Sequence, residues 1–236
     1  MNPPAIASNV LFEDNHLLII NKQPSQIVQG DKTGDQPLSE SLKEFIKIRD
    51  HKPGNVFLGV VHRLDRPVSG ALIFAKTGKA LTRLNNMLKS GEIHKTYWAV
   101  VKNKPPSDHD ELVHYLQRNE QKNKSFAFEN PKANSQRAEL TYHVVAKSNG
   151  YYLLEILLLT GRHHQIRAQL AKIGCPVKGD LKYGFNRSNP DGSIHLHSRK
   201  IELIHPVSKK KLEILADPPS EPLWNHFLKS IDSNKG

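Results

Sequence analysis

The sequence has little of what secreted and membrane proteins need. Its 236 residues include one cysteine, Cys175, so an intramolecular disulfide is excluded and a reducing compartment fits. The N-terminus lacks the basic and apolar regions of a signal peptide. The longest apolar runs, at 17–20 and 153–160, fall far short of the ~20 residues that span a bilayer. We therefore expect a cytoplasmic protein that does not enter a membrane.

Acidic residues are also few compared with basic ones. The chain has 34 lysines and arginines against 23 acids, a formal net charge of +11. An excess of this size favours a polyanionic partner, although a basic surface without a partner is the alternative. With 37% hydrophobic and 24% charged residues, the chain has enough apolar material for a packed core.

The apolar patterns predict both helices and strands. Strand pairs are expected within 10–22, on either side of a loop in 59–77, and around the Asn-Gly turn in 141–159. Helices are expected at 38–49, 78–91, 160–174 and from Pro222 onward, and further strands at 94–101, 200–204 and 211–215. The polar, lysine-rich stretch 102–137 is interpreted as a mobile insertion or as a solvated excursion. Because βαβ alternation is missing, we predict a single α+β domain over 1–236 with a mostly antiparallel sheet.

The segment HRLDRPVSG (62–70) places a carboxylate between two cations and two apolar strands. Arg63 and Arg66 flank Asp65, and nearby cations lower the pKa of an aspartate and keep it ionised. An ionised carboxylate suits a nucleophile or an electrostatic stabiliser better than a general acid. The alternative is a salt-bridged turn without chemistry.

A second cluster, GRHHQIR (161–167), contains Arg162, His163, Gln165 and Arg167. We expect these side chains in the first turns of a helix, where Gly161 permits close approach and the helix terminus adds positive charge. Such a cluster suits a phosphate or a carboxylate from elsewhere in the fold. A merely polar helix entry is the alternative.

Sites for metals or cofactors are not evident in the sequence. Adjacent His163 and His164 would point to different helix faces, and His195 and His197 have no evident third ligand. Phosphate-binding, dinucleotide-binding and hydrolase motifs are missing. Cys175 precedes a proline and has no apparent base, which favours a structural thiol. We expect no metal, no nucleotide cofactor and no other cofactor.

Taken together, these segments resemble the RluA-type family of pseudouridine synthases. The family's HRLD element stands here as HRLDRPVSG, its Lys-x-Tyr element as Lys95-Thr96-Tyr97, and its late element as GRHHQIR followed by GCPVKGDLKYG (174–184). The family's opening resembles 13–29, so the likeness covers about 10–215, which we take as the core of the domain. Val68 and His163 stand where the family usually has threonine, which bears on substrate preference and not on the reaction.

The resemblance implies a fold and a set of roles. The fold would be an α+β catalytic domain around a long, bent, mixed sheet, in the form that lacks the small N-terminal RNA-binding domain. Asp65 would be the catalytic aspartate, paired with Arg167, and it would detach uracil by attacking the sugar or the base or by removing a sugar proton. Tyr97 would stack on the uracil and help with the C5 proton, and Arg63 would fill the gap left by the flipped nucleotide.

The expected partner is tRNA or rRNA, bound by a monomer. Residues expected to contact RNA come from all three elements: Arg63, His62, Arg66, Arg162, His163, Gln165 and Lys95. A non-catalytic RNA-binding module of the same fold is the main alternative, but it predicts a changed aspartate. A glycosidase would need a second acid near Asp65, whose neighbours here are cations.

Overall fold

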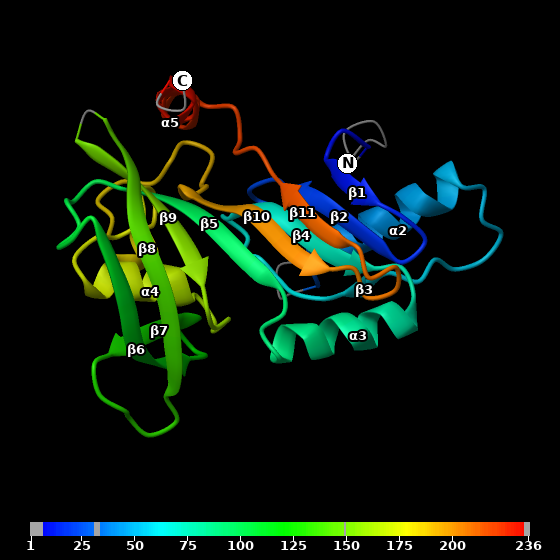
Figure 1. The fold of residues 1–236 in the computed structure, drawn as a ribbon, viewed down its shortest axis with the longest axis horizontal. Helices are drawn as coiled ribbons and strands as arrows, with labels where there is room; N and C mark the ends of the chain where they lie inside the picture. The colour runs from blue at the N-terminus through cyan, green and yellow to red at the C-terminus, as the bar shows by residue number, and fades with distance from the viewer. Residues whose placement is uncertain (1–6, 31–33, 149, 234–236) are drawn as a thin grey trace. The chain divides into compact units, whose positions relative to one another are not determined.

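The computed structural model describes residues 7–30, 34–148 and 150–233. Its strands belong to one open 11-stranded sheet in the order β1-β2-β4-β10-β5-β9-β8-β6-β7, with β3 beside β4 and β11 beside β10 (Figure 1). Helices flank the sheet, and antiparallel pairing dominates, which confirms the predicted α+β class. Residues 1–6, on which the signal-peptide expectation rests, and Asn149 of the Asn-Gly turn lie outside the described residues.

The chain folds as two compact units. The first comprises 1–93 and 198–217, and the second comprises 94–197 and 218–236. Both are built from chain segments that are not contiguous, and β10 (Leu196–Ile204) begins in the second unit and ends in the first. A single catalytic domain over 1–236 remains a prediction.

The first unit is built around two largely apolar strands, β2 and β4. Leu17 and Ile19 of β2 share a core with Ile73 of β4 and with Ala80 and Leu84 of helix α3. Both strands are buried on both faces, which explains their apolar runs at 17–20 and 71–75. The elements that complete this unit are β1 (Val10–Glu13), β2 (Leu17–Lys22), α2 (Leu38–Arg49), β3 (Gly59–Val60), β4 (Ser69–Ala75), α3 (Gly78–Lys89) and β11 (Lys211–Leu215).

The second unit holds the longer strands of the sheet. Trp98 and Leu153 pack with Trp224 and Phe227 of the last helix, and Ala168 of α4 packs against Leu116. Its elements are β5 (His94–Val101), β6 (His109–Asn119), β7 (Lys124–Phe128), β8 (Gln136–Ser148), β9 (Tyr151–Leu158), α4 (Gln165–Lys172), the short 3₁₀ helix η1 (Leu181–Tyr183) and α5 (Pro222–Ser233). The predicted hairpin in 141–159, strand at 94–101 and final helix are confirmed.

The prediction for 102–137 was wrong. The middle of this stretch forms β6 and β7, and β6 pairs with β8 over most of its length. Only one face of β6 is buried, through Leu112, His114 and Leu116, and the other face is more exposed and polar apart from Val113. Because few residues of the strand are apolar, the alternation is weak and resembles a solvated loop.

The predicted start of the helix over 160–174 was also wrong. Helix α4 begins at Gln165, and His164 before it has a left-handed backbone with φ of +53°. Arg162 and His163 therefore lie in the turn that leads into α4 and not in its first turns. A left-handed residue breaks helical geometry, which is why the helix cannot extend back to the Thr-Gly pair.

Candidate active site

The HRLD segment forms the loop between β3 and β4 of the first unit. Leu64 and Val68 are buried and anchor the loop, while Arg63 and Arg66 are exposed. The amide of Val68 donates to the carbonyl of Asp65 at 3.0 Å and closes a turn. Asp65 is therefore half-buried and lies on a tight turn between the buried side chains of Leu64 and Val68.

The other polar residues of this loop have defined places. The Nε2 atom of His62 accepts a hydrogen bond from the amide of Ile73 at 3.2 Å, so this histidine ties the loop to β4. The guanidinium of Arg66 pairs with the exposed carboxylate of Asp35. Arg63 is the exposed cation next to Leu64. An exposed arginine at this position suits contact with a nucleic acid.

A lysine that was not predicted lies beneath the loop. Lys22, at the end of β2, is fully buried. Its Nζ donates to the carbonyls of Gln23 at 3.0 Å, Arg66 at 3.2 Å and Val68 at 2.6 Å. Burial lowers the pKa of Lys22 to about 7, and the charge of Asp65 acts in the opposite direction. Two of the three carbonyls follow Asp65 in the loop, so Lys22 holds the backbone that carries the aspartate.

The sequence itself carries a signal for the burial of Lys22. In a strand, residues i, i+2 and i+4 share one face, and Lys22 follows Leu18 and Ile20 on an apolar face. A lysine on a buried face needs acceptors for its ammonium protons. The neighbouring loop supplies them through its backbone.

The glycine that ends the HRLD segment has a steric role. Gly70 has a φ of +116°, and a Cβ at this position would collide with the backbone of Ser198 in β10. Any other residue would be strained by the backbone angle and would displace β10. The Ser-Gly ending of the element is thus explained by close strand packing.

The remaining predicted residues lie in the second unit. Tyr97 sits in β5 opposite Ile156 of β9, and its side chain is buried. Lys95, two residues earlier on the same strand, is half-buried, and burial lowers its pKa. A Cβ on Gly161 would lie 3.7 Å from the Nζ of Lys95, so this amine is next to the turn that enters α4.

Arg167 forms a buried, bidentate ion pair that the sequence did not predict. Its Nε donates to Oδ2 of Asp180 at 2.7 Å and its Nη2 donates to Oδ1 at 2.9 Å. Arg167 is 4% exposed and Asp180 is 1% exposed. The guanidinium also lies 5.0 Å from the centre of the Tyr183 ring. Asp180 belongs to GCPVKGDLKYG, so this pair joins the two late elements of the sequence.

Gln165 is an internal link in the turn. Its Oε1 accepts from Oγ1 of Thr160 at 2.8 Å and from the amide of Arg162 at 3.0 Å. Its Nε2 donates to the carbonyl of Glu139 at 3.0 Å, and the residue is buried. Arg162 is exposed, and its Nε donates to the carbonyl of Arg137 at 3.1 Å. Gln165 therefore shapes the turn, and Arg162 is the residue placed at the surface.

His163 connects the same turn to β7. Its Nδ1 lies 2.9 Å from Oγ of Ser125 and its Nε2 lies 3.1 Å from Oδ1 of Asn123. Its ring stacks on that of His164 at 3.8 Å between centroids. His164 in turn contacts the hydroxyl of Tyr183 at 3.0 Å. The histidine pair is thus part of a hydrogen-bonded network, and the lysine-rich end of the β6–β7 hairpin is tied to α4.

The structure groups the predicted residues in two sets. His62, Arg63, Asp65 and Arg66 occur in the first unit, and Lys95, Tyr97, Arg162, His163, Gln165 and Arg167 occur in the second. Among the described residues, no three His, Cys, Asp or Glu side chains are gathered as metal ligands. Cys175 is buried, and burial raises the pKa of its thiol, which agrees with a structural role. No helix in the described part of the chain is long and apolar enough to cross a membrane.

Comparisons with known proteins identify the family. The profile of a family described as RNA pseudouridylate synthase matches residues 16–172. Ribosomal large subunit pseudouridine synthase C of Buchnera aphidicola (subsp. Acyrthosiphon pisum) is 33% identical over 96% of this chain and 71% of that protein. The protein of the same name from Vibrio cholerae is 32% identical over 94% of this chain and 68% of its own length.

A solved structure shares the fold. The structure of Human RNA Pseudouridylate Synthase Domain Containing 4 matches with a TM-score of 0.77 at 21% identity, covering 98% of this chain and 95% of that one. The resemblance to RluA-type enzymes is thereby confirmed, as is an isomerase activity on RNA. The motifs, the fold and the relatives agree that the chain belongs to the RNA pseudouridylate synthase family.

Proposed function

We propose that this enzyme converts specific uridines of large-subunit ribosomal RNA into pseudouridine, with Asp65 as the catalytic residue. The relatives named above modify ribosomal RNA of the large subunit by name, which favours rRNA over tRNA. The observation that carries the assignment of Asp65 is its position on a tight, anchored loop, half-exposed and flanked by two exposed arginines. Lys22 supports that loop through backbone carbonyls.

The reaction is an isomerisation, so no atom is gained or lost overall. The bond between N1 of uracil and C1′ of the ribose breaks, the base rotates, and C5 of the base bonds to C1′. C5 then loses its proton and N1 gains one, so the proton count is unchanged. Asp65 starts this sequence by attacking the sugar or the base, or by removing a sugar proton. An ionised carboxylate can fill each of these roles. No metal and no organic cofactor enters the scheme.

Other residues receive supporting roles in the proposal. Tyr97 stacks on the uracil and helps to move the C5 proton, and Arg167 pairs with Asp65 in the assembled site. Arg63 fills the space left by the flipped nucleotide, since C1′ is inaccessible within a stacked helix. His62, Arg66, Lys95, Arg162, His163 and Gln165 complete the RNA-contacting set, with the buried Gln165 acting through the shape of its turn. We further propose a cytoplasmic monomer.

The test is direct. Purified enzyme is incubated with unmodified large-subunit rRNA and, separately, with unmodified tRNA, and pseudouridines are mapped by chemical labelling and sequencing. We expect new pseudouridine in rRNA with the wild-type enzyme and none with Asp65→Asn. Modification of tRNA alone would overturn the choice of RNA, and modification by Asp65→Asn would overturn the choice of residue. Mapping total RNA from cells with and without the gene identifies the site in vivo.

A further inference from the structure

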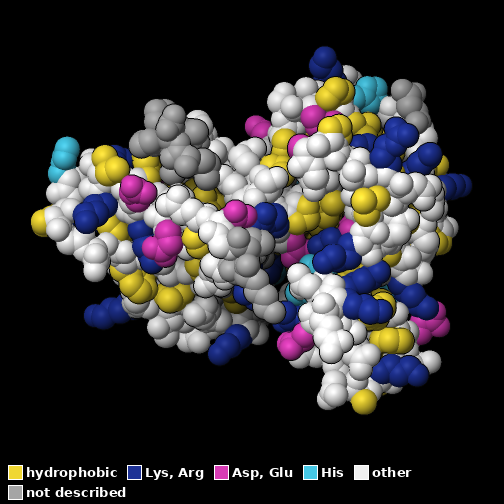
Figure 2. All heavy atoms as spheres, turned by 180° about the vertical axis from the view of Figure 1, so that it is seen from behind, with side chains coloured by type: hydrophobic (Ala, Val, Ile, Leu, Met, Phe, Trp, Pro, Cys, Tyr) yellow, Lys and Arg dark blue, Asp and Glu magenta, His cyan; other side chains and the backbone are white. Residues whose placement is uncertain are grey.

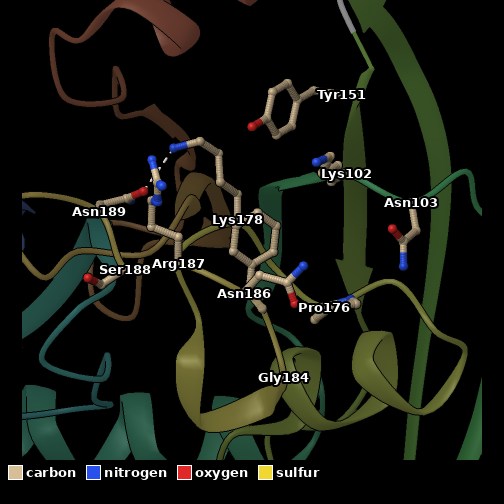
Figure 3. Close-up of a pocket in the computed structure, with 11 residues that line it drawn as sticks. Lys102, Asn103, Tyr151, Pro176, Lys178, Gly184, Asn186, Arg187, Ser188 and Asn189 are labelled. Carbon is tan, nitrogen blue, oxygen red and sulfur yellow. Dashed lines mark hydrogen bonds between the residues drawn. The ribbon is translucent and has the colours of Figure 1, made fainter.

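A basic hollow in the second unit is lined by residues other than those predicted for the candidate active site. Its volume is about 330 Å³, and it is lined by the chain after β5, the start of β9 and the loop over 176–189 (Figure 3). Three of the lining residues are the cations Lys102, Lys178 and Arg187, and none is acidic. Figure 2 shows that Lys and Arg side chains are spread over much of the visible surface. In the hollow, three cations line the same space.

The amine of Lys178 is held in place by a buried amide. Its Nζ donates to Oδ1 of Asn189 at 2.8 Å, as the dashed line in Figure 3 marks, and lies 3.5 Å from Nδ1 of His195. Asn189 is buried, and its Nδ2 donates to Oγ of Ser193 at 3.2 Å and to Nδ1 of His195 at 2.9 Å. Because Nδ1 accepts this bond, the proton of the His195 ring is on Nε2, facing Glu221 at 2.7 Å. The network fixes the direction in which Asn189 presents its oxygen to Lys178.

In the described part of the chain, the three cations of the hollow are not paired directly with carboxylates. Across the residues that the structure describes, Lys102, Lys178 and Arg187 have no carboxylate within ion-pair distance. Burial lowers the pKa of Lys178, and the charges of Glu221 and Asp191 act in the opposite direction. An anion bound in the hollow would interact favourably with all three cations.

We propose that this hollow binds a backbone phosphate of the substrate RNA. Lysine and arginine together suit a phosphate, since the guanidinium fork and the ammonium both donate charged hydrogen bonds to its oxygens. Tyr151 and Phe185, both half-buried in the lining, offer aromatic surface beside the cations. A single-stranded nucleotide presents both a phosphate and a ring, so it fits this lining better than a simple anion does. The proposal rests on RNA as substrate and does not depend on Asp65 or on the choice of rRNA.

The test compares the salt dependence of RNA binding between matched variants. Arg187→Gln and Lys102→Gln each remove one exposed cation of the hollow, and Lys79→Gln removes one exposed cation from α3 in the first unit. Binding of a short, labelled single-stranded RNA of mixed sequence is measured by anisotropy over a series of salt concentrations. Removing one phosphate-binding cation should lower the slope of log K against log salt by about 0.7. We expect that reduction, with a severalfold weaker Kd, for the two variants of the hollow and not for Lys79→Gln.

Three controls make the result decisive. Thermal melts establish that each variant is folded, which we expect because all three substituted side chains are exposed. Pseudouridine formation should show a raised KM and an unchanged kcat for the variants of the hollow. If they match Lys79→Gln in Kd, slope and KM, the proposal is overturned, whatever RNA the enzyme modifies. Titration with inorganic phosphate and uridine monophosphate tests whether the hollow binds a free anion instead. If either ligand binds saturably to the wild-type enzyme while Arg187→Gln has unchanged RNA affinity, the hollow is a site for a free anion and the proposal is overturned.

Discussion

The loop that carries Asp65 and the turn that leads into α4 both place arginines near a carboxylate, yet the two are built differently. Asp65 is half-buried on a loop whose backbone is held from below by Lys22. Arg167 is buried, and two charged hydrogen bonds join it to Asp180. A half-exposed carboxylate on a surface loop suits contact with a substrate. A bidentate pair removed from water stabilises the fold first, and its loss leaves a charge without its partner.

The largest effect expected in this comparison is on turnover at Asp65. Asp65→Asn keeps the size of the side chain and removes the reactive charge. We expect pseudouridine formation to be abolished while RNA affinity stays within severalfold of wild type. Single-turnover kinetics and a binding titration measure the two quantities. Asp35→Asn serves as the control, because it removes the charge that pairs with Arg66 and should leave turnover near the wild-type rate. An active Asp65→Asn enzyme would end the case for this residue.

The next largest effect is on stability at Arg167. Arg167→Met leaves the buried carboxylate of Asp180 without its partner, and breaking a buried pair of this kind costs ~3–5 kcal/mol of unfolding free energy. Activity should fall as well. Urea unfolding measures the loss of stability. Asp180→Asn should be destabilised too, and the double variant should lose less than the two single losses combined, because the pair acts as a unit. Unchanged stability in Arg167→Met would show that the pair contributes nothing to the fold.

Tyr97 tests whether the second unit contributes chemistry as well as shape. Tyr97→Phe keeps an aromatic face, and stacking is worth ~1–3 kcal/mol per base, but the hydroxyl is lost. We expect RNA to bind normally while complete turnover becomes slow. Quench-flow analysis of product formation checks this. Tyr142→Phe, which removes another buried hydroxyl of the same unit, should turn over normally. Wild-type rates for Tyr97→Phe would show that its hydroxyl has no chemical role.

Lys22, which supports the loop of Asp65, should make the free energy of unfolding depend on pH. The pKa of Lys22 is about 7 in the folded protein and 10.5 when the side chain is free, so between these values the unfolded chain binds more protons. The contribution of Lys22 to the unfolding free energy therefore rises as the pH increases from about 7 to 10.5. As the pH falls back to about 7, this contribution is lost. Lys22→Met has no such proton. Subtracting its unfolding free energy from that of wild type at several pH values should give a difference that grows with pH, and a flat difference would contradict this assignment.

The smallest effect is expected at His163. His163→Thr restores the residue usual at this position in the family and removes the bonds to Ser125 and Asn123. A typical net hydrogen bond contributes ~1 kcal/mol, so a loss of roughly 1–2 kcal/mol in unfolding free energy should follow. Turnover should stay near wild type. Denaturant melts and initial rates test the two expectations. A collapse of activity with full stability would contradict this expectation and show that the His163 imidazole is needed for turnover beyond its contact with RNA.

Much of the fold could be predicted because its elements carry strong local patterns. The β1–β2 pair, α2, α3 and α5 have clear apolar periodicity or turn residues, and the structure has them where they were expected. The β6–β7 hairpin could not be predicted, because one face of β6 is exposed to solvent and the apolar alternation of the strand is weak. In addition, β6 pairs with β8, whose residues are distant in the sequence.

The site was predictable in its residues and not in their partners. Asp65 and Arg167 stand out as charged residues in distinctive segments. The pairing of Arg167 with Asp180 depends on the chain folding back over 13 residues, which no short-range pattern encodes. Lys22 was missed because a lysine at the end of a strand is ordinarily at the surface. Its ammonium group can be buried because carbonyls of the HRLD loop accept its hydrogen bonds, and the sequence does not show that the folded loop brings them there.

The division of the first unit between two stretches of chain has a consequence for synthesis. Gly70 in β4 packs against Ser198 in β10. Within the first 93 residues, β3 pairs only with the end of the β4 edge that faces β10, so most of that edge stays uncovered until the far segment leaves the ribosome. At ~5–20 residues per second, the intervening stretch takes on the order of 5–20 s to translate. An uncovered apolar strand edge is a template for wrong pairing during that interval. A nascent chain stalled before residue 198 should therefore recruit chaperones, and one released after residue 217 should not.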